Sequence, residues 1–138
     1  MATPAPPVPI DPVAEAGQLA DLFNNLSQAL DDFRLGDHTP PVPADQLARL
    51  KDEAQAMEDR AHFFTAQAIG ATLQSIQSDL ANIKAVTAQA KAQLVVLNDV
   101  SKVISIATSA LSLGTAIAAG NPASIAAAAD ALAQTLSG

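Results

Sequence analysis

The feature that most constrains this chain is a block of 27 residues, 103–129, without a single ionisable side chain. The 102 residues before it carry all seven cations and 13 of the 14 anions. The block is too apolar for an ordinary solvated helix face, yet it is too rich in Ala, Ser, Thr and Gly for a core of large side chains. We therefore expect this segment to be covered by protein or by lipid.

The composition favours helix over sheet. Hydrophobic residues make up 49% of the chain, but Phe is the only aromatic, with four copies. Ala is the strongest helix former, whereas strands pack best with β-branched and aromatic side chains. A chain of 138 residues is long enough to bury one core without disulfides or metals. We predict one all-α domain over residues 11–138, preceded by a Pro-rich extended arm at residues 1–10.

The first helix is expected over residues 12–35. Asp11 can cap its free amides, and Pro12 suits the first turn, where no amide donor is needed. Apolar residues recur at three- and four-residue spacing as far as Phe33, and the stripe ends at Gly36. Prolines then make a connector that is not helical.

From residue 43 to residue 97 the sequence predicts one long amphipathic, coiled-coil-like helix of about 80 Å. Its apolar spacing slips by one residue between Phe64 and Ile69, which predicts a kink or a change of partner helix. Asn98 and Asp99 are the only residues that could separate this helix from the next, and the sequence leaves open whether they do. The expected seam for a partner helix contains Ile69, Leu73, Ile76, Leu80, Ile83, Leu94 and Leu97.

The uncharged block predicts a C-terminal apolar helical hairpin, with helices at about 100–119 and 122–136. Gly120 can end the first helix, and Asn121 with Pro122 can begin the second. Small residues four positions apart would let another helix approach closely. The expected contact surface, for a second subunit or for a bilayer, contains Val103, Ile106, Ala110, Leu113, Gly114, Ile117 and Ala118.

The hairpin has two interpretations. Residues 103–120 are at the lower limit of length for spanning a bilayer, and the second arm is too short to return across. A constitutive two-span anchor is therefore excluded. Burial at a protein interface is the favoured interpretation, and conditional membrane insertion of residues 103–119 is the alternative.

Charge argues against nucleic acid as a partner, and composition leaves the compartment open. With a formal net charge of −7 and seven scattered cations, the chain lacks the basic patch that nucleic acid requires. It contains no cysteine, so redox chemistry does not indicate a compartment. The N-terminal residues do not resemble a secretory signal, so we expect a cytoplasmic protein or export by a route without a standard signal peptide.

No pattern indicates an enzyme. Glu58 and His62 share a helix face, but a carboxylate-bridged metal site needs this motif on other helices as well. His38 is expected to be a solvated loop residue. The six glycines form no phosphate loop, and no nucleophile stands in a recognisable triad. We expect no catalytic residue, metal or cofactor.

A stalk at residues 69–97 with an uncharged head at residues 100–136 resembles the subunits of bacterial α-helical pore-forming toxins. This arrangement is equally similar to two-helix proteins that build filaments and shells. The first resemblance implies a membrane-active protein, and the second implies a structural one. We expect a non-enzymatic helical protein that forms homo-oligomers or assembles with related helical subunits, with membrane insertion as the alternative.

Overall fold

The structure is a computed structural model that describes residues 11–38 and 41–137. Helices cover 86% of these residues, which contain no strand, so the prediction of an all-α fold is confirmed. The Pro-rich arm at residues 1–10 lies outside the described part. The helices are α1 (Pro12–Leu35), α2 (Ala44–Phe63), α3 (Ala66–Ser75), α4 (Leu80–Val96), α5 (Val100–Ala119) and α6 (Pro122–Ser137).

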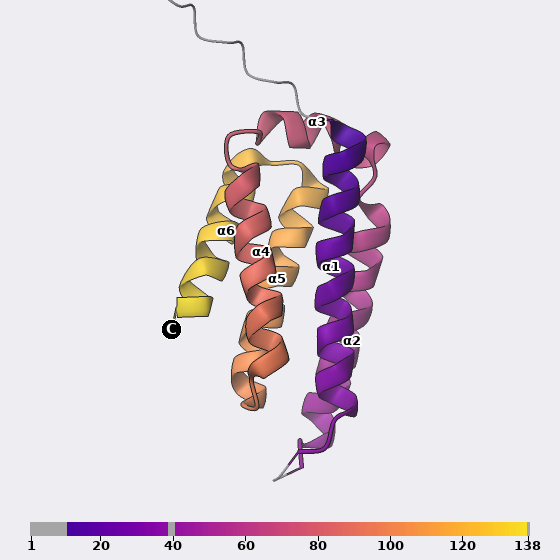
Figure 1. Ribbon diagram of the computed structural model, residues 1–138, viewed down its shortest axis with the longest axis vertical. Helices are drawn as coiled ribbons and strands as arrows, with labels where there is room; N and C mark the ends of the chain where they lie inside the picture. The colour runs from indigo at the N-terminus through magenta and orange to yellow at the C-terminus, as the bar shows by residue number, and fades with distance from the viewer. Residues whose placement is uncertain (1–10, 39–40, 138) are drawn as a thin grey trace, which may run out of the picture.

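Four helices form an elongated bundle, and two shorter ones cover it (Figure 1). In the bundle α1 packs on α2 and α4, while α5 packs on α2 and α4. The shorter α6 lies against α5 and α4, and α3 crosses the end of the bundle where α1 begins. The links between α1 and α2 and between α4 and α5 lie at the opposite end.

The prediction of one helix from residue 43 to residue 97 is wrong, because this stretch forms α2, α3 and α4. The first break lies at Phe64 and Thr65, where the apolar spacing slips. Thr65 has extended backbone angles, and its side chain accepts a hydrogen bond from the amide of Ala68 as the N-cap of α3. The change of phase therefore marks the end of one helix and the start of another.

The second break, a turn at residues 76–79, was not predicted. At the end of α3 the carbonyl of Thr72 accepts from the Ser75 hydroxyl at 2.7 Å and from the amide of Ile76 at 3.1 Å. The apolar spacing runs through this break without a slip, because Ile76 and Leu80 are buried in the same core. The apolar spacing therefore predicted correctly which residues are buried, but it predicted wrongly that one helix continues through residues 76–79.

The ends of α1, α5 and α6 have local causes that the sequence shows. Asp11 accepts from the amides of Val13 and Ala14, and Asp99 accepts from that of Ser101 at 3.0 Å. Gly120 ends α5 with a φ of 81°, a left-handed conformation that glycine adopts without strain. The helices that these residues delimit lie within one residue of their predicted bounds at both ends.

One close contact fixes how near α5 comes to α1. Gly114 is buried, and a Cβ added there would lie 2.8 Å from Cε1 of Phe23 in α1. The Phe23 ring is itself fully buried and meets the Phe64 ring edge-on, with 5.2 Å between the centroids. A side chain at position 114 would therefore have to displace a ring that is held on its other side.

We expect Gly114→Leu to lower the free energy of unfolding by about 1–3 kcal/mol through overpacking against Phe23. The matched control is Gly17→Leu, because Gly17 is an exposed helical glycine with nothing within 4 Å of an added Cβ. The control should be neutral or stabilising by up to about 1 kcal/mol, since Leu favours helix. Urea unfolding followed by circular dichroism measures both. Equal effects of the two substitutions would contradict the close contact.

Candidate functional site

The residues predicted to form a subunit or membrane interface lie in the chain's own core. Leu97 and Ala118 are half-buried, and the other twelve are buried. Their contacts come from other helices of the same chain, so covering them requires no second copy. The buried twelve are Ile69, Leu73, Ile76, Leu80, Ile83, Leu94, Val103, Ile106, Ala110, Leu113, Gly114 and Ile117.

Along one side of α5 and α6 the exposed and half-buried residues carry no charge, and we call this surface the neutral face. The exposed Asp130 of α6 lies on another side of that helix. On α5 the neutral face is a row of hydroxyls at three- and four-residue spacing. Thr135 of α6 lies beside it, because its hydroxyl is 3.0 Å from that of Ser109, and three residues share its side of α6. The neutral face contains Ser101, Ser105, Thr108, Ser112 and Thr115 on α5, and Ser124, Ala128, Ala131 and Thr135 on α6.

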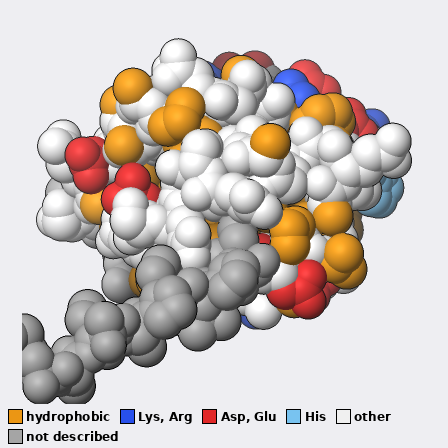
Figure 2. Space-filling model, turned by 90° about the horizontal axis from the view of Figure 1, so that it is seen from above, with side chains coloured by type: hydrophobic (Ala, Val, Ile, Leu, Met, Phe, Trp, Pro, Cys, Tyr) orange, Lys and Arg blue, Asp and Glu red, His pale blue; other side chains and the backbone are white. Residues whose placement is uncertain are grey.

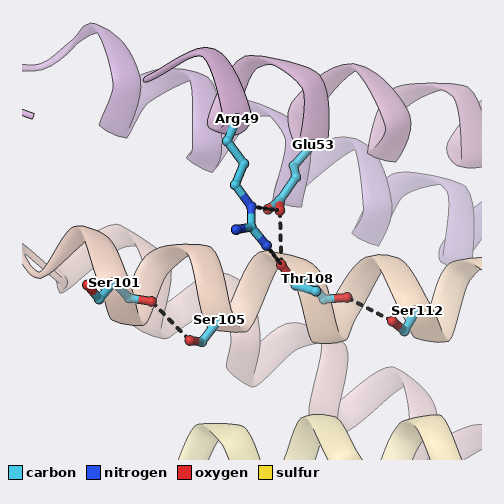
Figure 3. Close-up of polar contacts among 6 residues, drawn as sticks. All are labelled: Arg49, Glu53, Ser101, Ser105, Thr108 and Ser112. Atoms are coloured by element: carbon cyan, nitrogen blue, oxygen red, sulfur yellow. Dashed lines mark hydrogen bonds and ion pairs between the residues drawn. The ribbon is translucent and has the colours of Figure 1, made fainter. Parts of the chain in front are cut away.

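Several hydroxyls of the neutral face bond to their own helix (Figure 3). Ser105 donates to the carbonyl of Ser101, and Ser112 donates to that of Thr108, both at 3.0 Å. Thr135 does the same to the carbonyl of Ala131 at 2.9 Å. A hydroxyl whose proton is already bonded loses less when water is removed. The neutral face is therefore cheaper to dehydrate than its polar composition suggests.

One carboxylate borders the neutral face where α5 meets α2 (Figure 3). Glu53 of α2 is 8% exposed, and its Oε1 accepts from the Thr108 hydroxyl at 2.9 Å and from Nε of Arg49 at 3.2 Å. Arg49 also donates to the Thr108 hydroxyl at 3.3 Å. The contact joins a buried carboxylate to an exposed cation and to a hydroxyl of α5.

Glu53 belongs to a line of polar side chains on α2, which we call the α2 polar row. Gln46, Glu53 and Arg60 stand seven residues apart and so lie on one side of the helix. Each has a buried polar atom without a hydrogen-bond partner: Oε1 of Gln46, Oε2 of Glu53 and Nε of Arg60. A buried polar atom left unpaired costs about 1–3 kcal/mol. At Glu53, which contacts Thr108, the contact between α2 and α5 is therefore weaker than an apolar contact would be.

Two side chains, one from α4 and one from α5, bond to backbone carbonyls at the end of α6. Gln93 of α4 donates to the carbonyl of Leu136 at 3.0 Å, and Nζ of Lys102 donates to the carbonyl of Thr135. These donors bond to carbonyls that the last turn of a helix leaves without a partner. A cation at this end also interacts favourably with the negative end of the helix dipole. The charged Lys102 is thus used to hold α6 against α5.

A second uncharged segment joins the first in the folded chain. No ionisable residue lies between His62 and Asp79, and this stretch contains α3. It meets the turn between α5 and α6, where a Cβ on Gly120 would lie 3.1 Å from the Thr72 hydroxyl. Figure 2 looks down on this end, and its red and blue side chains lie mostly toward the rim. The exposed residues of α3 therefore add a second surface without charge, although Asp11 and Asp79 are exposed at the same end of the bundle.

The histidines do not form a site. His38 is half-buried rather than solvated, because its Nε2 is 2.6 Å from the carbonyl of Phe33 and its ring packs on the Phe33 ring at 4.3 Å. Glu58 and His62 are both exposed. A hollow of about 460 Å³ beside His38 is lined by acidic Asp37 and Asp99 among others. Within residues 11–38 and 41–137, no group of three or more His, Asp or Glu is placed to hold a metal.

Among the described helices, α5 alone is long and apolar enough to cross a bilayer by length and composition, and 44% of its most apolar stretch is buried. No model of a known protein family, no curated protein and no solved structure matches the chain. Sequence reasoning missed the α2 polar row, although its seven-residue spacing beside the apolar stripe is visible. The row was missed because polar residues of an amphipathic helix are expected on its solvated side.

We expect Glu53→Met to raise the free energy of unfolding by about 1 kcal/mol, because it replaces a poorly paired buried carboxylate by an apolar side chain of similar size. Thr108→Val should lower it by about 1–2 kcal/mol, because Glu53 then loses a donor while it stays buried. Thr115→Val, on the same exposed side of α5, is the control and should change little. Urea unfolding measures these changes. A loss of stability in Glu53→Met would contradict the predicted cost of the buried carboxylate.

Proposed function

We propose that this protein is a non-enzymatic assembly component that self-associates, with the α5–α6 pair as its subunit interface. The observation that carries the proposal is the neutral face. The chain has 14 anions and seven cations, yet none of them is among the residues that make up this face, and Arg49 and Glu53 lie at its border. A net charge of −7 makes two copies repel each other on average, and this repulsion is smallest across the neutral face. The proposal places the contact on the exposed side of α5 and α6, since the apolar side is already covered.

The size of the neutral face supports a second copy as its occupant. A helix of 20 residues is about 30 Å long, and two neighbouring helices together are about 20 Å wide, which gives roughly 600 Å². Stable interfaces bury about 800 Å² on each partner, which this face approaches if the uncharged residues of α3 contribute. Ala, Ser and Thr let backbones come close, and the hydroxyls bonded to their own helix cost little to dehydrate.

Charges placed on the neutral face should prevent the association. We expect the double substitution Ser105→Glu with Thr115→Glu to lower the mass measured by light scattering toward 14.0 kDa, because facing carboxylates repel. The control adds the same charge elsewhere, as Asn24→Glu with Gln28→Glu on exposed positions of α1. The control should keep the mass of the unsubstituted protein. A protein that is already a monomer at micromolar concentration would remove the basis of the proposal.

The second candidate is a membrane-active protein that inserts α5 into a bilayer. It is favoured by the length and apolarity of α5 and by the hydroxyls of Ser105 and Ser112, which bond to backbone carbonyls as they would need to in lipid. Against it, 44% of the most apolar stretch of α5 is buried, so insertion would first require α5 to leave the bundle. The assembly proposal therefore stands first.

Dye release from liposomes separates the two candidates. We expect no release by the unsubstituted protein. If release occurs, Ser112→Asp should abolish it, because this exposed position tolerates a charge in the folded protein but not in a bilayer. Release that persists in Ser112→Asp would exclude insertion of α5 as its cause. Release that this substitution removes would favour the membrane-active candidate over assembly.

A further inference from the structure

We infer that the α5–α6 pair can be exchanged between two copies of this chain, with residues 97–99 as the hinge. In the exchanged dimer, α5 and α6 of each copy occupy their places on α2 and α4 of the other. This inference rests on the proposed self-association and specifies its structural form. It is carried by the hinge, by the α2 polar row and by exposed valines beside the hinge.

The hinge is short and contains nothing that prevents it from becoming helical. Only Leu97, Asn98 and Asp99 lie between α4 and α5, and none of them is Gly or Pro. Leu97 and Asp99 have extended backbone angles, with ψ of 142° and 109°. Rotation of these few residues into the helical region would join α4 and α5 into one helix over residues 80–119, about 60 Å long. The apolar spacing of the sequence left the same continuation open.

The closed and exchanged forms share their contacts between helices. When α5 and α6 leave, Ile106, Leu113 and Ile117 must find the same apolar cover again, which a second copy provides. The free-energy difference between the two forms therefore arises mainly at the hinge and at any new contact beside it. Passage between them requires separation of α5 from α2, where Glu53 of the α2 polar row recovers water for its unpaired oxygen.

The surface beside the hinge carries apolar side chains that the single chain leaves uncovered. Val95 and Val96, at the end of α4, are 66% and 75% exposed. Leu35, at the end of α1, is 72% exposed and lies at the same end of the bundle. In an exchanged dimer the two hinges lie side by side at this end, so that these side chains face those of the second copy. The exchanged form thus gains a contact that the closed form lacks.

Cross-linking tests the exchange directly, because the chain contains no cysteine of its own. The amide of Gln93 in α4 contacts the carbonyl of Leu136, which places the neighbouring Ser137 close to it. Gln93→Cys and Ser137→Cys are made in separate full-length chains, which are unfolded together, refolded together and treated with a short bismaleimide. Exchange predicts a covalent dimer that joins one chain of each kind. The control pair, Gln28→Cys with Ser137→Cys, should give none.

The outcomes separate this inference from the proposed function. A dimer by light scattering without the covalent 93–137 product overturns exchange and leaves association through the neutral face intact. A monomer under all conditions overturns both. Because α4 and not the neutral face carries Gln93, a surface contact through the neutral face does not give the product.

Two hinge variants provide a second test. Asp99→Ala removes the side-chain cap of α5 and favours a continuous helix, so it should lower the dimer dissociation constant by about tenfold. Asn98→Pro prevents a helix from passing through the hinge and should abolish the covalent product. Circular dichroism checks that both variants fold. A dimer that responds to neither substitution overturns the role of residues 97–99.

Discussion

The burial of α5 against α1 and α2 is the contact on which the rest of the structure depends. The absence of a side chain at Gly114 lets α5 approach the Phe23 ring, and Phe64 holds that ring from the other side. Through this approach the apolar half of the uncharged block is covered inside one chain. The helix keeps hydroxyls on its exposed side, so the single chain presents a neutral surface instead of an apolar one. Assembly through the neutral face would therefore start from a folded subunit.

The two sides of α5 are bound with unequal strength. Toward α6, Lys102 of α5 donates to the carbonyl of Thr135. Toward α2 it meets the α2 polar row, in which Glu53 has one paired and one unpaired oxygen. Buried carboxylates of this kind reduce stability relative to apolar residues of the same size. At Glu53 the α5–α6 pair is thus held to the remainder of the bundle by a contact that is weaker than an apolar one.

Association through the neutral face and exchange at the hinge use contacts of different kinds. A surface contact uses hydroxyls and alanines that are exposed in the folded subunit, whereas exchange uses contacts that the subunit already makes. Both rely on the same property of the sequence, which is the absence of charge over residues 103–129. A charged α5 would gain little from either contact, because the desolvation of ions opposes close packing.

Local chemistry in the sequence determined the helical class, the position of most helix ends and the identity of the buried residues. Caps at Asp11, Asp99 and Gly120 act within a few residues, and the three- and four-residue spacing records burial wherever the partner lies. The spacing does not record which helix covers which, so a folded chain and a long rod with partners have the same pattern. The turn at residues 76–79 has no slip in spacing that would reveal it. Only the tertiary structure decided that the seam from Ile69 to Leu94 is covered by the chain itself, because that depends on the chain reversing direction.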